Sequence, residues 1–415
     1  MSDKRHACFV KFMEDHFFSP ENVIYSMIDR KTLLPATEEI FKDCPPRENN
    51  PDAAGHFIAC VPGFSRSEFI NYENCCMATG SAMASTMMEY KRTKNSAVLE
   101  RAKRLFSGIK TICDCGKSFE EGFIPKFYGG RFTYQTSTDQ CFYLIWGLDM
   151  YYESADSSER SFIEKQIPAI ADFWMRHNYT WSYFQFKDMV WPPLRFPPIL
   201  LMAWYYSGDI KYKKEADKIM AENIDCIPEF DRVARFRNRR FCDYEEKYNI
   251  RVMNCIADSS AMDTMNLSVM IRFESDSEFV PVWKKGIVTT WDQAKTAIQD
   301  DGMAYTGAFY DVAKKKIVKP YPDTLWRWAK TSWSSVLVRG GLMALSYMPE
   351  KRDEVMKYAE LVLDSLEPEK MVYWDELKNF PPDCCYHDKL LCGTALANYL
   401  WAWELFDEIK NSPHR

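Results

Sequence analysis

The feature that most constrains this fold is an alternation of two kinds of helical segment. Segments that are apolar nearly all round cover 67–91, 138–153, 198–207, 261–273, 332–347 and 389–408. The first five are each followed, after a short turn, by amphipathic segments: 95–115, 158–177, 210–226, 276–285 with 290–299, and 350–366. An apolar helix must be buried, whereas a helix with one charged face lies outside.

The last apolar segment lacks a following partner, and the amphipathic residues 5–18 are the candidate for that place. Six inner and six outer helices predict an all-α fold, an (α/α)6 toroid or six-hairpin barrel. An open superhelical array is the competing arrangement, but it is typical of chains with a fixed repeat period, and none is present here.

Composition narrows the class of protein. The 415 residues are 47% hydrophobic and contain no Ser/Gly-rich linker, which favours one domain over 1–415. A net charge of -6 with mixed signs disfavours a nucleic-acid partner. No apolar run approaches the roughly 20 residues of a membrane span, and the N-terminal residues do not resemble a signal peptide. Several of the fourteen cysteines lie in apolar helical segments, which favours free thiols and a cytoplasmic location.

Three stretches are predicted to be loops at the rim of the ring. Residues 30–66 are rich in Pro and Gly, while 122–135 and 300–323 each have the pattern of a small β-hairpin. Because loops on a rigid scaffold carry most ligand contacts, we expect them to surround a cleft.

Two aspartates are candidates for acid/base chemistry, which needs carboxyl groups at the cleft end of inner helices. Asp139 follows Ser137, which has capping-box spacing to Gln140. Asp263 is predicted in the first turn of another inner helix. The structural alternative is that both acids only stabilise helix starts, by roughly 0.3–1 kcal/mol each, and that Asp263 caps its helix together with Ser260.

A resemblance to a known family covers about residues 258–345. The run Met262–Leu267 resembles the Asp-x-Met-Met-Asn-Leu stretch of unsaturated glucuronyl hydrolases, in the six-hairpin glycosidase superfamily. Residues 299–305 are similar to a family segment in which Arg-Asp-Asp-Gly precedes a short hairpin. The run Trp328–Trp333 resembles the family's Trp-Ala-Arg-Gly-x-x-Trp, but Lys330 and Thr331 replace Arg-Gly and one residue fewer precedes the second Trp.

This resemblance implies an acid/base role for Asp263 and, by looser analogy, a second essential aspartate at Asp139. The matched segment lies later in this chain than in the family, which a circular offset of the hairpins or a distant relationship would explain.

Aromatic and basic side chains in loops are candidates for binding a sugar. Flat rings bury the C–H faces of sugars, and a guanidinium suits a uronate carboxylate. Packing between helices and solvation at the surface are the structural alternatives. The candidate substrate-binding residues are Arg131, Tyr134, Trp191, Arg195, Trp328, Trp333 and His387.

The predicted function is therefore hydrolysis of glycosides in uronic-acid-containing saccharides, with a small-molecule or oligosaccharide substrate. A polysaccharide lyase with a Tyr or His base and a non-enzymatic glycan-binding toroid are the alternatives. A terpenoid cyclase would need an Asp-rich motif that is missing. Neither metal nor cofactor is expected, because zinc-ligand spacings and nucleotide-binding Gly motifs are missing. The basic run 232–240 is predicted to be a solvated loop. The sequence leaves the oligomeric state open.

Overall fold

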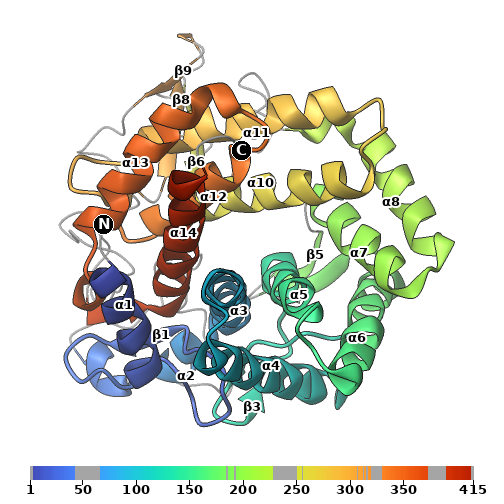
Figure 1. Cartoon of the computed structure of the whole chain (residues 1–415). Coiled ribbons are helices and arrows are strands. Elements are labelled where there is room, and N and C mark those ends of the chain that lie inside the picture. The colour runs from blue at the N-terminus through green and yellow to red at the C-terminus, as the bar shows by residue number, and fades with distance from the viewer. Residues whose placement is uncertain are drawn as a thin grey trace.

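Six inner helices form a closed ring in the computed structural model (Figure 1). The model describes residues 3–42, 66–183, 186–190, 193–227, 250–254, 256–305, 307–311, 313–314, 316–318, 330–372 and 389–412. The inner helices are α3 (Cys75–Thr93), α5 (Thr138–Tyr152), α7 (Pro197–Ser207), α10 (Ile256–Phe273), α12 (Ser334–Ala344) and α14 (Gly393–Asn411). Around them lie α4 (Ser96–Lys117), α6 (Ser157–Arg176), α8 (Ile210–Glu222), α11 (Val280–Ala294), α13 (Arg352–Ser365) and α1 (Asp3–His16).

The ring closes because the last inner helix, α14, packs against the first, α3. Helix α12 packs against both α10 and α14, and α7 packs against α10. An open array would leave its first and last units apart, so the predicted toroid is confirmed.

Burial follows the sequence pattern. In α3, every residue from Cys75 to Met87 is buried, whereas α4 buries one apolar stripe and exposes its lysines. This part of α3 is covered on all sides, so it has no face on which a charged side chain could remain hydrated.

Short antiparallel strand pairs decorate the ring. The hairpin of β2 (Phe127–Tyr128) with β3 (Arg131–Phe132) confirms the prediction for 122–135. In the described part of 300–323, β8 (Gly307–Asp311) pairs with β9 (Lys316–Val318), as predicted, and also with β6 (Ile250–Asn254). The other pairs are β4 (Thr180–Tyr183) with β5 (Phe186–Val190), β7 (Ala304–Tyr305) with β10 (Lys330–Thr331), and β1 (Met27–Asp29) with β11 (Leu390–Cys392).

Two predicted helix boundaries are wrong. The segment 67–91 is broken into α2 (Arg66–Tyr72) and α3, because Asn74 takes a left-handed conformation with a φ of 45°. The segments 276–285 and 290–299 are instead one helix, α11, which a short 3-10 turn follows. Thr289 and Thr290, which favour a break, are both buried inside it, so tertiary packing overrides their low helix propensity.

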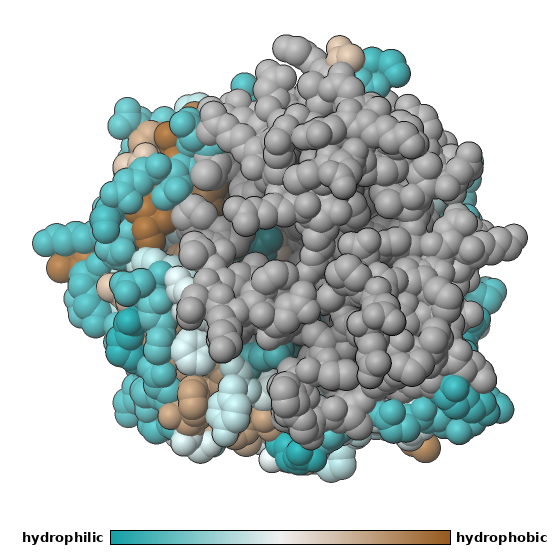
Figure 2. All heavy atoms as spheres, turned by 180° about the vertical axis from the view of Figure 1, so that it is seen from behind, coloured by the Kyte–Doolittle hydropathy of each residue, from teal (hydrophilic) through white to brown (hydrophobic). Residues whose placement is uncertain are grey.

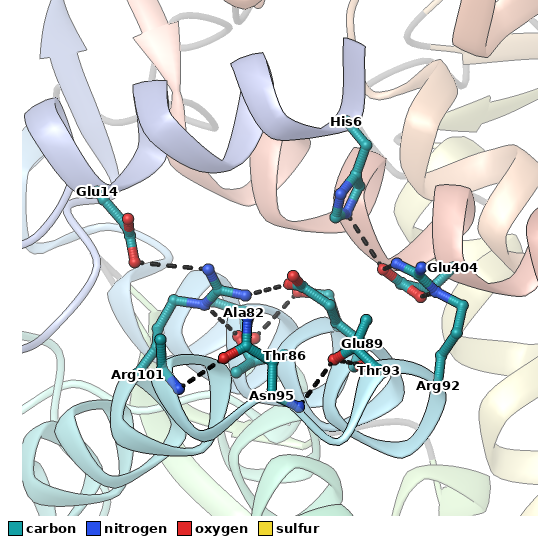
Figure 3. A network of polar contacts seen from close by, with 12 residues as sticks. His6, Glu14, Ala82, Thr86, Glu89, Arg92, Thr93, Asn95, Arg101 and Glu404 are labelled. Atoms are coloured by element: carbon teal, nitrogen blue, oxygen red, sulfur yellow. Dashed lines mark hydrogen bonds and ion pairs between the residues drawn. The ribbon is translucent and has the colours of Figure 1, made fainter. Parts of the chain in front are cut away.

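Helix α1 docks on α14 and supplies the sixth outer helix, as predicted (Figure 3). The rings of Phe9 and Tyr399 stack with their centroids 3.6 Å apart. The His6 imidazole Nε2 lies 3.2 Å from Glu404, which also accepts two hydrogen bonds, of 2.8 and 2.9 Å, from the Arg92 guanidinium. Charged and aromatic contacts therefore join the N-terminal helix to the point where the ring closes.

Seven cysteines in the described chain are free thiols: Cys8, Cys75, Cys76, Cys113, Cys115, Cys141 and Cys392. Five of these are buried, which fits their apolar sequence context. Among the described residues, none of the helices is both long and apolar enough to span a bilayer.

Candidate functional site

The inner helices all begin at one face of the ring, which we call the start face. Each inner helix except α14, whose partner α1 begins the chain, runs into its outer partner through a short connection, such as the two residues Gly208–Asp209 between α7 and α8. Helices joined in this way are antiparallel. The connections from each outer helix to the next inner helix are longer, and they must all lie at the start face.

Contacts between neighbouring helix starts confirm this arrangement. The Gln140 side chain, in the first turn of α5, donates from Nε2 to Asn74 just before α3, over 3.0 Å. The indole N–H of Trp333, just before α12, donates to the Cys392 sulfur just before α14, over 3.1 Å. Side chains that begin different inner helices are thus neighbours at one face.

Asp263 lies deeper in its helix than the sequence suggests. Helix α10 begins at Ile256, directly after β6, so Asp263 is its eighth residue and Ser260 is an interior position. The predicted first-turn position and the predicted cap with Ser260 are both wrong. The helix therefore begins five residues before the predicted start at residue 261.

The environment of Asp263 favours a proton on its carboxyl group. The side chain is partly buried, and burial raises the pKa of Asp263 to about 6, against the opposing effect of the Arg195 guanidinium. Arg195 ends a 3-10 turn, Pro193–Arg195, that leads into α7. The predicted sugar-binding Arg195 is therefore an electrostatic neighbour of the predicted acid.

Asp139 lies in the first turn of α5, as predicted, and is partly buried. The predicted capping box is wrong, because Ser137 makes no side-chain cap. The Gln140 side chain instead accepts a hydrogen bond from the Cys76 backbone N–H over 3.1 Å and so binds the start of α3.

Both acids lie in the first half of their helices. At the opposite face, Asp149 of α5 accepts hydrogen bonds from Arg272 of α10, over 2.7 Å, and from Tyr206 of α7, over 2.8 Å. Asp139 precedes Asp149 by ten helical residues and Asp263 precedes Arg272 by nine, which at 1.5 Å per residue is about 15 Å along α5 and about 14 Å along α10. Two different inner helices thus carry acids toward the same end of the ring.

A buried ion pair beside Asp139 was not predicted. Lys126, just before β2, binds Glu73, just before α3, and the two side chains are 1% and 5% exposed. Burial raises the pKa of Glu73, and the Asp139 charge adds to this effect, while Lys126 opposes it. Neither residue belongs to a recognisable motif, and their 53-residue separation gives no sequence signal.

The remaining predicted substrate-binding residues have different environments. Tyr134 is 63% exposed, whereas Trp333 is only 8% exposed. Arg131 is exposed and forms an ion pair with Glu68, 2.5 Å from Nη1 to the carboxylate. Trp191, Trp328 and His387 lie outside the described residues, as do the basic run 232–240 and its neighbours.

Several buried polar side chains in the described chain have an oxygen without a hydrogen-bond partner, and three of them lie on inner helices or just before one. They are Asn266, one turn after Asp263, Gln135, three residues before α5, and Ser334, the first residue of α12. Such atoms are costly to bury unless water or a ligand binds them.

One group of possible metal ligands lies away from the start face. It consists of His6, Glu89 and Glu404, whose ligand atoms lie within 4.8 Å of one another (Figure 3). Both carboxylates already bind arginines: Glu404 binds Arg92, and Glu89 binds Arg101. These positive charges oppose a bound cation, so the group fits an ion-pair network better than a metal centre.

Comparison with known proteins identifies the fold. A scan of protein-family models finds no match, and neither does a search of curated proteins. Solved structures do match. A D-mannose isomerase superposes with a TM-score of 0.56 at 11% identity, covering 98% of this chain and 97% of its own.

An unsaturated glucuronyl hydrolase specific for heparin gives a TM-score of 0.53 at 11% identity, covering 98% of this chain and 97% of its own. A sugar epimerase from a ruminal bacterium gives 0.51 at 12% identity over 97% of this chain and 98% of its own. The chain has the six-hairpin toroid fold of these proteins. At this identity, the similarity concerns the fold.

Proposed function

We propose that this protein is a carbohydrate-active enzyme, specifically a glycoside hydrolase for uronic-acid-containing saccharides, with Asp263 as general acid/base and Asp139 as its partner. The observation that carries the proposal is the raised pKa of Asp263, about 6, on an inner helix of a toroid. A general acid works best when its pKa lies near the working pH, and an ordinary surface aspartate is fully ionised there.

Two further observations support this assignment. Asp139 lies in the first turn of another inner helix, α5, and is partly exposed, so water can reach it. Arg195, whose charge acts on Asp263, offers a guanidinium to the carboxylate of a uronic acid. The fold is shared with a glucuronyl hydrolase, whose sequence motif resembles Met262–Leu267.

The separation between the carboxyl groups would define the reaction. About 5–5.5 Å favours a retaining double displacement, and about 6.5–9.5 Å favours inverting attack by water. The unsaturated glucuronyl hydrolases are instead thought to hydrate the double bond of the sugar, and for such a reaction this rule does not apply.

Isomerisation is the second candidate, because a D-mannose isomerase and a sugar epimerase share the fold. A carboxyl group with a pKa near 6 is also suited to moving a proton between neighbouring carbon atoms. A hydrolase releases a new reducing end, whereas an isomerase converts a free sugar without cleavage, so product analysis distinguishes the two.

The test is turnover on a panel of saturated and unsaturated uronides and free hexoses. We expect Asp263→Asn to lower turnover of a uronide by at least about a hundredfold. The matched control is Asp276→Asn, an exposed aspartate after the opposite end of the same helix. Equal activity of Asp263→Asn and the unmodified protein would remove Asp263 from the mechanism, and conversion of free hexoses alone would favour isomerisation.

A further inference from the structure

An exposed group of aromatic rings lies on the connections at the start face. Phe119 follows the end of α4, Tyr134 precedes α5, and Trp181 follows α6. We call these three residues the rim platform. Phe119 and Tyr134 are 45% and 63% exposed, which places them among the most exposed large apolar side chains in the described chain.

The platform is held in a fixed shape. The rings of Phe119 and Tyr134 lie 5.0 Å apart, and that of Trp181 lies 6.2 Å from Phe119. The Trp181 indole N–H donates to the Tyr134 backbone carbonyl over 3.0 Å, which ties two separate connections together. Trp181 also packs on the buried Phe173, with centroids 4.9 Å apart. A ligand that binds here therefore has little side-chain entropy to remove.

Polar groups lie beside these rings. Glu120 accepts hydrogen bonds from Arg176, over 2.8 Å, and lies 2.9 Å from the His177 Nε2 atom. The His177 ring meets the Trp181 ring edge-on at 4.6 Å. Although burial opposes it, the hydrogen bonds from Arg176 and His177 hold the pKa of Glu120 below its usual value. The carboxylate stays ionised and keeps a partly exposed acceptor next to the rings.

This combination matches the surface of a pyranose, which has one C–H-rich face and a rim of hydroxyl groups. Flat aromatic rings bury the C–H face, while a carboxylate and an imidazole bind hydroxyl groups. Figure 2 shows weakly polar and hydrophobic atoms together at the lower left, over the part of the ring that α4 and α6 form.

The platform is also continuous with the candidate site. Only four residues separate Tyr134 from Asp139, and the five chain steps between them limit their distance to about 17 Å even in an extended chain. The intervening residues 135–138 are buried and form one short connection from Tyr134 to the start of α5. An oligosaccharide held at Asp139 is therefore long enough to reach the platform.

We propose that the rim platform of Phe119, Tyr134 and Trp181 is a distal subsite that binds a pyranose ring of the saccharide substrate outside the reacting position. This inference rests on the proposed function, because it takes the substrate to be a saccharide bound near Asp139. It makes the protein selective for oligosaccharides over the shortest substrates.

Calorimetric binding tests the proposal on the full chain carrying Asp263→Asn, which prevents turnover. The probes are hexasaccharides of hyaluronan, unsulfated chondroitin and polyglucuronic acid, with their disaccharides. We expect Phe119→Ala and Tyr134→Ala each to weaken binding of the best hexasaccharide about tenfold, and that of its disaccharide less than twofold. Tyr205→Ala is the matched control, because Tyr205 is 53% exposed near the end of α7 at the opposite face.

Thermal melts confirm that each variant is folded. The proposal is overturned if the platform variants and Tyr205→Ala bind the hexasaccharide equally well. It is also overturned if the platform variants lose the same affinity for the hexasaccharide and the disaccharide, or if no hexasaccharide binds. Failure of the hydrolase assignment has a different signature. In that case the unmodified protein turns over no uronide, while the platform variants still lose affinity for the longer probe.

Discussion

Replacing Asp263 with asparagine is expected to stabilise the folded protein at high pH. Burial raises the pKa of Asp263 from its ordinary value of 3.8 to about 6. The folded state therefore binds this proton more tightly than the unfolded state, and stability falls as the pH rises from about 4 to about 6. The difference between these two pKa values corresponds to a loss of at most about 3 kcal/mol of unfolding free energy. Since the side chain is partly exposed, we expect a loss of about 1–3 kcal/mol.

Asparagine keeps the shape of the side chain without the charge. Above pH 7, Asp263→Asn should unfold at a higher urea concentration than the unmodified protein, and near pH 4 the two midpoints should converge. Asp276→Asn, at an exposed position, should stay within about 0.5 kcal/mol at both pH values. The reasoning is refuted if Asp263→Asn is less stable than the unmodified protein at pH 8, because the ionised carboxylate would then be a stabilising structural group.

Three other predictions concern parts of the ring away from Asp263. Lys126→Met should cost about 3–5 kcal/mol of unfolding free energy, because it leaves the Glu73 carboxylate buried without the Lys126 ammonium group. Adding Glu73→Leu to this variant should recover most of the lost stability, and no recovery would contradict a charge-based cause. Glu404→Gln should cost about 3 kcal/mol of unfolding free energy, because Arg92 and His6 lose the buried negative charge that they contact, whereas the exposed Glu360→Gln should change the urea midpoint little; equal effects would contradict a role in ring closure. Thiol titration of the denatured, unreduced protein should find most of the fourteen cysteines reactive, and five or more disulfides would overturn the predicted cytoplasmic location.

The ring was predictable because its helices are long and their burial is extreme. The apolar run around Ile199–Ala203 can only be an interior helix, and the charged run that follows can only be an outer one. The same logic assigned α1 to the place beside α14. Local exceptions were not predictable in this way, since the break at Asn74 depends on a left-handed backbone angle that Gln140, 66 residues away, supports.

The candidate site was predictable only in part. Asp139 was placed correctly because a Ser-Thr-Asp run marks the start of α5. Asp263 was placed too near a helix start because the polar run Asp258–Ser260 gives the same signal but lies inside α10. The Lys126–Glu73 pair and the rim platform depend on contacts between separate connections. Such contacts have no fixed spacing in the sequence, so they emerge only from the folded ring.

The pH dependence of kcat/KM on a uronide substrate tests the central claim most directly, because it reports the ionisation of the essential acid in the free enzyme. If protonated Asp263 is the acid, the rate should fall above about pH 6. Arg195→Gln should move this fall to higher pH, since the guanidinium lowers the pKa of Asp263. A flat profile between pH 5 and 8, or a fall whose midpoint Arg195→Gln leaves unchanged, would contradict the assignment of Asp263 as the proton donor.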